Sequence, residues 1–231
     1  MTTCVISQPR FFPGLHYLDR MVQADVFVIF DTVQFTPRHE ENRAKLKTRD
    51  GTQWLSVPVQ KLGRDMRIVD TMPSPDQPWQ DAAIKTLAHL YGKAPHYAAH
   101  KDEVEAILRA PHRNLTELDR ASWAPALRLC GIDCEFVLAS ELPVEGRGPE
   151  LLLAICRHLG ADVYLSGGFG REYLEPDTFA AAGVEVRYHE FEYPTYPQRF
   201  GEFTPFLSYL DALFCTGLRR DELAWPASSS Q

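Results

Sequence analysis

Two polar residues directly follow apolar runs that read as buried strands. Gln8 comes after residues 5–7 and before Pro9, and Asp31 comes after residues 26–30. Because proline cannot continue a strand ladder, the first strand must end there and give way to a loop. In open α/β sheets, the loops at the carboxyl ends of strands hold ligands. We therefore predict that Gln8 and Asp31 are catalytic, with Asp31 orienting or deprotonating a nucleophile. The alternative is that both side chains cap nearby backbone groups.

A basic segment lies within this acidic protein at residues 38–49. Arg43 and Lys45 are two positions apart, so in extended chain they point to one face and can clamp a carboxylate or phosphate. We predict that Arg43 is a third catalytic residue, which holds an anionic group, and that Asn42 and Lys45 bind substrate. The alternative is a solvated run of charges, which is the usual meaning of such a stretch.

A glycine-rich turn follows another predicted strand and reads Ser166-Gly167-Gly168-Phe169-Gly170-Arg171. Glycines at these positions let backbone amides approach a ligand closely, and the arginine adds charge. We predict that Ser166, Gly167 and Arg171 bind substrate. The turn matches neither the Walker motif nor G-x-G-x-x-G, so it specifies no nucleotide, and a plain glycine turn is the alternative.

An extended aromatic segment follows the last predicted strand and reads Glu192-Tyr193-Pro194-Thr195-Tyr196-Pro197-Gln198. Segments of this kind lay a rigid wall along a cleft, so we predict that Tyr196 and Gln198 bind substrate. The alternative is a buried arm that packs on the sheet, a role that tyrosine and proline serve equally well.

The composition excludes several classes of function. The chain has 231 residues and a formal net charge of −7, which disfavours general nucleic-acid binding. No apolar stretch is long enough to span a bilayer and no signal peptide is recognised, so we expect a cytoplasmic protein with a small-molecule substrate and no membrane partner. The five cysteines predict reduced thiols. Cys130 and Cys134 lack a second pair with ligand spacing, so no metal site is predicted, while the sequence leaves the cofactor and the oligomeric state open.

The elements that must position these residues alternate along the chain. Apolar runs and helical spacing predict strands at 4–7, 26–30, 54–59, 135–138, 163–165 and 184–188, and helices at 15–23, 79–91, 102–109, 115–129, 149–159, 177–182 and 208–217. This order predicts right-handed crossovers and a parallel sheet. The expected fold class is α/β, a mainly parallel sheet with flanking helices of Rossmann-like type. We expect a single domain over residues 1–231, with a helical segment inserted at about 73–130.

Several segments, taken in order, resemble the WbqC-like family. They are Ile6-Ser7-Gln8-Pro9, Asp25-Val26-Phe27-Val28, Asp31-Thr32-Val33-Gln34-Phe35, Asn42-Arg43, Trp54-Leu55-Ser56-Val57-Pro58, Tyr164-Leu165-Ser166-Gly167, Tyr173-Leu174, Pro194-Thr195-Tyr196-Pro197-Gln198 and Leu207-Ser208-Tyr209-Leu210-Asp211. The resemblance runs from about residue 4 to residue 217. In place of the family's Pro-Trp, histidine and lysine, this chain has Pro13-Gly14, Tyr193 and Arg171.

The resemblance implies a bacterial protein of polysaccharide biosynthesis, of the O-antigen kind, or of natural-product biosynthesis, with transfer of an amino acid such as glycine as a suggested chemistry. We expect an acyl or aminoacyl transferase acting on a sugar or small metabolite. Two alternatives stay open: a non-catalytic metabolite-binding or scaffold protein, and a nucleotidyl-transfer enzyme. The expected enzyme brings Gln8, Asp31, Arg43 and Ser166 into one pocket above the strand ends.

Overall fold

The computed structural model describes residues 1–60, 63, 65–219, 223 and 225, and the chain forms two compact units. Unit 1 comprises Met1–Gln8, Asp19–Thr32 and Asp133–Glu192, and unit 2 comprises Pro9–Leu18, Val33–Ile132 and Tyr193–Gln231. The segments of the two units therefore alternate along the chain. Helix α1 (Leu15–Val22) begins in unit 2 and ends in unit 1. The single domain expected over residues 1–231 stays a prediction.

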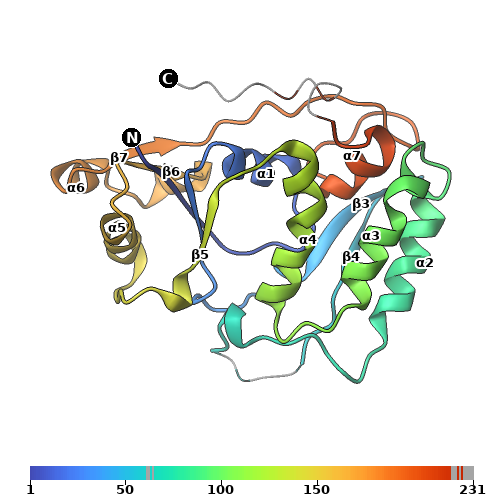
Figure 1. Cartoon of the computed structure of the whole chain (residues 1–231), viewed down its shortest axis with the longest axis horizontal. Coiled ribbons are helices and arrows are strands. Elements are labelled where there is room, and N and C mark those ends of the chain that lie inside the picture. The colour runs from blue at the N-terminus through green and yellow to red at the C-terminus, as the bar shows by residue number, and fades with distance from the viewer. Residues whose placement is uncertain (61–62, 64, 220–222, 224, 226–231) are drawn as a thin grey trace. The chain divides into compact units, whose positions relative to one another are not determined.

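Unit 1 is built on a five-stranded sheet in which all neighbouring strands are parallel. The strand order is β5-β2-β1-β6-β7, with helices α5 and α6 beside the sheet (Figure 1). Its elements are β1 (Thr3–Ser7), β2 (Val26–Ile29), β5 (Glu135–Leu138), η2 (Ala139–Glu141), α5 (Gly148–His158), β6 (Val163–Ser166), η3 (Gly168–Glu172), α6 (Pro176–Ala181) and β7 (Glu185–Tyr188). The expected α/β fold of Rossmann-like type is confirmed.

The strand order reverses between β1 and β6. From β1 the chain adds β2 and then β5 on one side, and it returns to add β6 and then β7 on the other side. At such a point the loops after the two central strands diverge, which leaves room for a ligand at the carboxyl edge of the sheet. These are the loops that begin at Gln8, after β1, and at Gly167, after β6.

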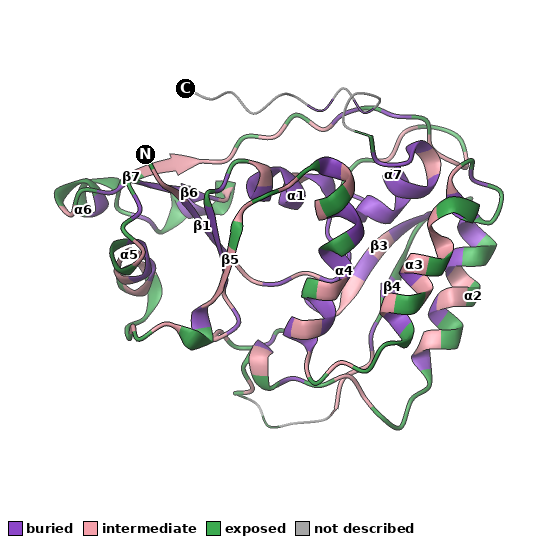
Figure 2. Cartoon of the chain, viewed as in Figure 1, coloured by how far each residue is buried: buried purple, intermediate pink, exposed green. Residues whose placement is uncertain are grey.

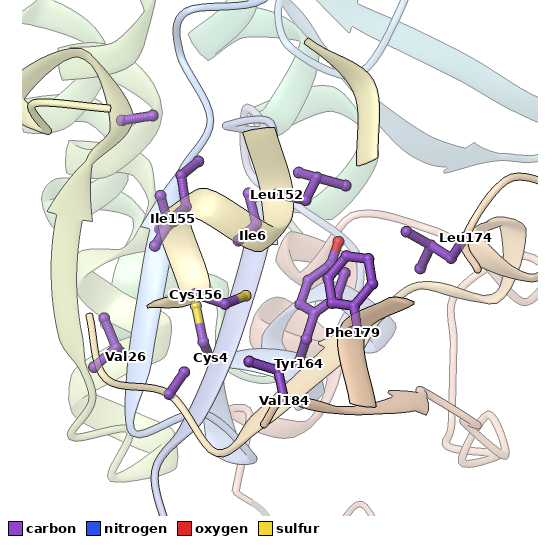
Figure 3. Packing of buried hydrophobic residues seen from close by; sticks show 13 residues of the cluster. Cys4, Ile6, Val26, Leu152, Ile155, Cys156, Tyr164, Leu174, Phe179 and Val184 are labelled. Carbon is purple, nitrogen blue, oxygen red and sulfur yellow. The ribbon is translucent and has the colours of Figure 1, made fainter. Parts of the chain in front are cut away.

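The core of unit 1 forms where alternate strand residues meet the helices. Cys4, Ile6, Val26 and Val28 lie on one face of β1 and β2, and Leu152, Ile155 and Cys156 of α5 belong to the same cluster (Figure 3). Phe179 of α6 is 1% exposed and stacks on the Tyr164 ring of β6, with 5.8 Å between ring centroids. Every residue of β2 and β6 is buried, as expected for parallel strands that are covered on both faces.

Unit 2 combines an antiparallel hairpin with four α-helices. Strands β3 (Arg43–Thr48) and β4 (Gly51–Ser56) pair from Arg43 opposite Ser56 to Thr48 opposite Gly51. The helices are α2 (Trp79–Tyr91), α3 (Tyr97–Arg109), α4 (Leu115–Cys130) and α7 (Tyr209–Thr216), and η1 (Ile68–Asp70) precedes them. Helices α2, α3 and α4 stand side by side, and α2 and α3 expose their outer faces (Figures 1 and 2).

Helices α2, α3 and α4 lie within residues 73–130, where helices were predicted, and their status as an insertion in one domain stays a prediction. The predicted N-cap of α4 is confirmed, because the Asn114 Oδ1 accepts from the Glu117 N–H at 2.9 Å. The hairpin of β3 and β4 differs from the prediction. A strand was predicted at 54–59, whereas β4 ends at Ser56, before Pro58, and its partner β3 was predicted only as extended chain. None of the described helices is long and apolar enough to cross a membrane.

The stacked Phe179 offers a test of the unit 1 core. Phe179→Ala should lower the free energy of unfolding by about 3–5 kcal/mol, because it opens a cavity against Tyr164. Phe169→Ala is the matched control, since Phe169 is 82% exposed, and should change the free energy by less than about 0.5 kcal/mol. Urea denaturation measures both, and equal losses would contradict the described packing.

Candidate functional site

The predicted site residues divide between the two units. Gln8, Asp31, Ser166, Gly167 and Arg171 belong to unit 1, whereas the unit 2 set comprises Asn42, Arg43, Lys45, Tyr196 and Gln198. Within unit 1 they follow or end strands β1, β2 and β6, whose carboxyl ends share one edge of the parallel sheet. The meeting of both sets in a single pocket stays a prediction.

The Ser166 side chain packs against the glycine turn that follows β6. A Cβ on Gly170 would lie 2.2 Å from the Ser166 Oγ, so only glycine allows the two to pack this closely. Ser166 is 2% exposed, and its Oγ donates to the Gly167 carbonyl at 3.2 Å. A Cβ on Gly168, by contrast, would meet no described atom within 4 Å. The turn therefore has one packed side, at Gly170, and one open side, at Gly168.

A buried histidine–aspartate pair lies beside this turn. His189 directly follows β7, and its backbone N–H donates to the Ser166 carbonyl at 2.8 Å. The His189 Nε2 lies 2.7 Å from Asp19 Oδ2 on α1, and both side chains are 7% exposed. The same Asp19 oxygen accepts from the Gln23 Nε2 at 2.6 Å. Asp19 therefore fixes the orientation of the imidazole.

Two arginines add positive charge to this edge of the sheet. Arg20, the neighbour of Asp19 on α1, is 8% exposed, and its Nη1 lies 3.4 Å from where a Cβ of Gly167 would stand. Arg171 stacks over the Tyr188 ring at 4.3 Å, and its Nη2 donates to Glu190 at 3.0 Å. Arg20 thus faces the turn itself, while Arg171 is engaged at the end of β7.

Asp31 is held in unit 1 by hydrogen bonds, and Gln8 lies at the start of a loop. Asp31 is completely buried, and its two oxygens accept from Ser140, Oδ1 from the N–H at 3.0 Å and Oδ2 from the hydroxyl at 2.8 Å. Asp31 therefore holds the first turn of η2, 109 residues further along the chain, and its catalytic role stays a prediction. Gln8 is half-buried where the β1 loop begins.

The pair of Asp19 and His189 has the geometry of a general base. An ionised carboxylate can only accept hydrogen bonds, so Nε2 carries the proton that bonds Asp19, and the lone pair of a neutral ring is then on Nδ1. An imidazole held in one tautomer in this way can take a proton from a reacting hydroxyl or amine. His189 and Asp19 were not predicted from the sequence, although His189 follows a strand just as Asp31 does.

In unit 2, the basic residues of the hairpin have different environments. The Arg43 guanidinium stacks over the Trp54 ring at 3.9 Å, and the Asn42 Nδ2 donates to the Val57 carbonyl at 2.8 Å. Arg43 and Lys45 are half-buried and alternate with the buried Ala44, so they share one face of the strand, as the spacing predicted.

A buried polar network includes Lys47 of β3 and Asp211 of α7. The Lys47 Nζ donates to the Gln198 Oε1 at 3.0 Å and to the carbonyl of Glu202. The Tyr91 hydroxyl donates to Asp211 Oδ1 at 3.0 Å. Burial raises the pKa of Asp211 to about 6, although the bond from Tyr91 opposes the rise. Gln198 therefore serves an internal network, and Tyr196, whose pKa is raised by burial and by nearby Asp211, is also buried.

Two further carboxyl groups of unit 2 escaped prediction. Asp119 of α4 is completely buried, and Glu41 is 3% exposed. Among the described residues, the two carboxyl oxygens of Asp119 have no hydrogen-bond partner, and the same holds for Oε2 of Glu41. Burial raises the pKa of both groups, and the nearby Glu41 raises that of Asp119 further. The sequence signal for Asp119 was an acidic residue at a core position of an amphipathic helix. Within the described ranges, no three histidine, cysteine or acidic side chains are grouped so as to hold a metal ion.

Comparisons with known proteins agree with the resemblance seen in the sequence. The model of the WbqC-like protein family matches residues 8–222. The chain is also similar to the uncharacterized protein Rv1507c of Mycobacterium tuberculosis, with 30% identity over 219 residues, which cover 94% of this chain and 95% of that protein. No solved structure matches the chain.

The two sides of the glycine turn can be separated by mutation. Gly170→Ala should lower the free energy of unfolding by about 1–3 kcal/mol, because its Cβ collides with Ser166. Gly168→Ala, where the space is open, should leave stability within about 0.5 kcal/mol of the wild type. Chemical denaturation compares the two, and an equally damaging Gly168→Ala would show that the open side is also packed.

The raised pKa of Asp211 predicts a pH dependence of stability. Folded Asp211 keeps its proton up to about pH 6, whereas the unfolded side chain releases it near its ordinary pKa of 3.8. The stabilisation is therefore fully present below pH 4 and is lost as the pH rises through 6, by about 2–3 kcal/mol in total. Asp211→Asn should remove this part of the decline, and Asp102→Asn, at an exposed site, should not. Urea melts from pH 4 to pH 7 measure the difference, and parallel curves for Asp211→Asn and wild type would disprove the assignment.

Proposed function

Because the chain belongs to the WbqC-like family, we propose that it is a bacterial biosynthetic transferase that moves an acyl or aminoacyl group, of the glycine type, onto a sugar or small metabolite. The family is linked to biosynthesis, and the proposal adds the reaction class. The acceptor in this proposal belongs to polysaccharide or natural-product assembly.

The contact that supports the proposal is the 2.7 Å bond between the His189 Nε2 and Asp19. Acyl transfer to a hydroxyl or amine needs a group that removes a proton from the nucleophile as it attacks. His189 supplies this group at the carboxyl edge of the sheet, next to the glycine turn. Asp31 is a weaker candidate for this role, because its oxygens already accept from Ser140.

In the proposed step, His189 takes a proton from the acceptor and passes it to the leaving group. The acceptor oxygen or nitrogen forms a bond to the carbonyl carbon of the donor, and its proton passes to the Nδ1 of His189. The bond from that carbon to the leaving group then breaks, and the leaving group departs with the electron pair and takes the proton from the imidazole. Asp19 stabilises the imidazolium between the two transfers.

The charge that develops on the carbonyl oxygen needs a stabilising partner. Arg20 lies against Gly167, and the open side of the turn at Gly168 lets a ligand approach the main chain. A guanidinium in a buried site is worth more to an oxyanion than it would be in water. In this proposal Arg20 and the glycine turn bind the anionic side of the reacting group.

The proposal is tested by replacing His189. The purified protein is incubated with panels of acyl and aminoacyl donors and of sugar acceptors, and mass spectrometry detects products whose mass has increased by the transferred group. His189→Ala and Asp19→Asn should each lower turnover about 10²–10⁴-fold. His158→Ala, at an exposed position of α5, should retain wild-type turnover.

Melting temperatures of all variants separate loss of chemistry from loss of folding, and His189→Gln serves where the alanine variant is unstable. Wild-type turnover that survives in folded His189 variants would overturn the assignment of the base. Donors or acceptors that raise the wild-type melting temperature without any product would favour the metabolite-binding alternative.

A further inference from the structure

Three cations of unit 2 line one pocket. Arg49 comes from the turn between β3 and β4, Lys93 follows the end of α2, and Arg199 belongs to the segment after Gln198. The cavity has a volume of about 640 Å³, within the range of small-ligand sites. Asp50, Leu90 and Phe200 also line it.

The described residues that line the pocket carry a net positive charge. Among the described residues, none of the three cations forms an ion pair with a carboxylate. Asp50 is the one acidic residue in the lining, so the pocket keeps a formal excess of two positive charges. This excess stands out in a protein whose formal net charge is −7.

Hydrogen bonds of the buried network hold the segment of the pocket wall that carries Arg199. Lys47 donates to Gln198, whose amide exchanges two hydrogen bonds with the backbone of Thr204, at 2.8 Å and 2.9 Å. Arg199 itself donates through Nη1 to the carbonyl of Leu90 near the end of α2. Its remaining donors are held in a planar fork, which matches the oxygens of a phosphate.

The same wall presents an aromatic ring in a strained conformation. Phe200 has a φ of 61°, in the left-handed region that a phenylalanine rarely adopts, and its ring lies 4.6 Å from the Arg199 guanidinium carbon. Backbone strain of this kind persists where the surroundings enforce it, and it gathers at ligand sites. The ring adds a flat apolar surface to a pocket whose lining also includes Ala88 and Leu90.

We propose that this pocket binds a phosphate-bearing metabolite, with Arg49, Lys93 and Arg199 around the phosphate. A phosphate monoester carries a charge of about −2 near neutral pH, which matches the excess of two, and a pyrophosphate carries about one charge more, whereas a simple monocarboxylate would satisfy a single arginine fork. A nucleic acid is disfavoured by the acidic protein around the pocket. The site lies within unit 2, so it stands independently of the proposed transfer at His189.

The test is isothermal titration of the full-length protein with pyrophosphate, with a nucleoside diphosphate and with succinate. Arg49→Gln and Lys93→Gln change exposed side chains and should each weaken pyrophosphate binding about 10-fold, with a smaller salt dependence. Lys85→Gln removes an exposed cation of α2 that does not line the pocket, and it should leave the affinity unchanged. Melting temperatures confirm that each variant is folded.

The outcomes separate the possible sources of the phosphate. A nucleoside diphosphate that binds more tightly than pyrophosphate, and loses this advantage in Phe200→Leu, identifies a nucleotide as the ligand. Equal affinities identify the phosphate group alone. Absence of pyrophosphate and nucleotide binding at millimolar concentration, equal binding of succinate, or binding that Arg49→Gln and Lys93→Gln leave unchanged would overturn the proposal.

Discussion

The pairing of β1 with two neighbours is the constraint on which unit 1 depends. β1 bonds β2 on one side and β6 on the other, both in parallel, and parallel strands are stable only when both faces are covered. Within unit 1, residues of α5 and α6 pack against one face of β1, β2 and β6. Because the strand order reverses at β1, the loops at Gln8 and Gly167 begin at neighbouring strand ends. The position of the pair of Asp19 and His189 beside the glycine turn follows from this topology.

Unit 2 is organised instead by polar groups inside its core. Lys47 is 2% exposed, and its ammonium group connects β3 to the segment around Gln198 and Glu202. A buried charge is tolerated only when its donors are satisfied, so Lys47 dictates how that segment runs. Arg199 and Phe200 lie between Gln198 and Glu202, the two residues that Lys47 bonds, so this bonding constrains the segment that carries them. Asp119 and Glu41 show the opposite case, in which both oxygens of Asp119 and Oε2 of Glu41 are buried without hydrogen-bond partners among the described residues.

The sequence predicted what depends on neighbours along the chain. The parallel sheet, the helices α2 and α4 and the Asn114 cap all follow from local spacing, and they are confirmed. Strand β3 was missed as a strand because its lysines and arginine were interpreted as a basic segment, although Ala44 and Leu46 alternate with them, and the Asp50-Gly51 turn signal was not used. His189 was missed because its partner Asp19 is 170 residues away, and no local pattern reports such a pairing. For the same reason, the union of the predicted site residues in one pocket stays a prediction.

The interleaving of the two units has a consequence for how the protein is made. The Thr2 N–H bonds Asp162, 160 residues further on, where β6 begins beside β1. At the usual pace of translation, the ribosome needs on the order of ten seconds to produce that second partner. Until then the apolar edge of β1 stays unpaired on the nascent chain, which makes early aggregation or capture by chaperones a hazard of biosynthesis. Unit 1 cannot close before its last segment, Asp133–Glu192, has emerged, and unit 2 must wait for the segment that begins at Tyr193.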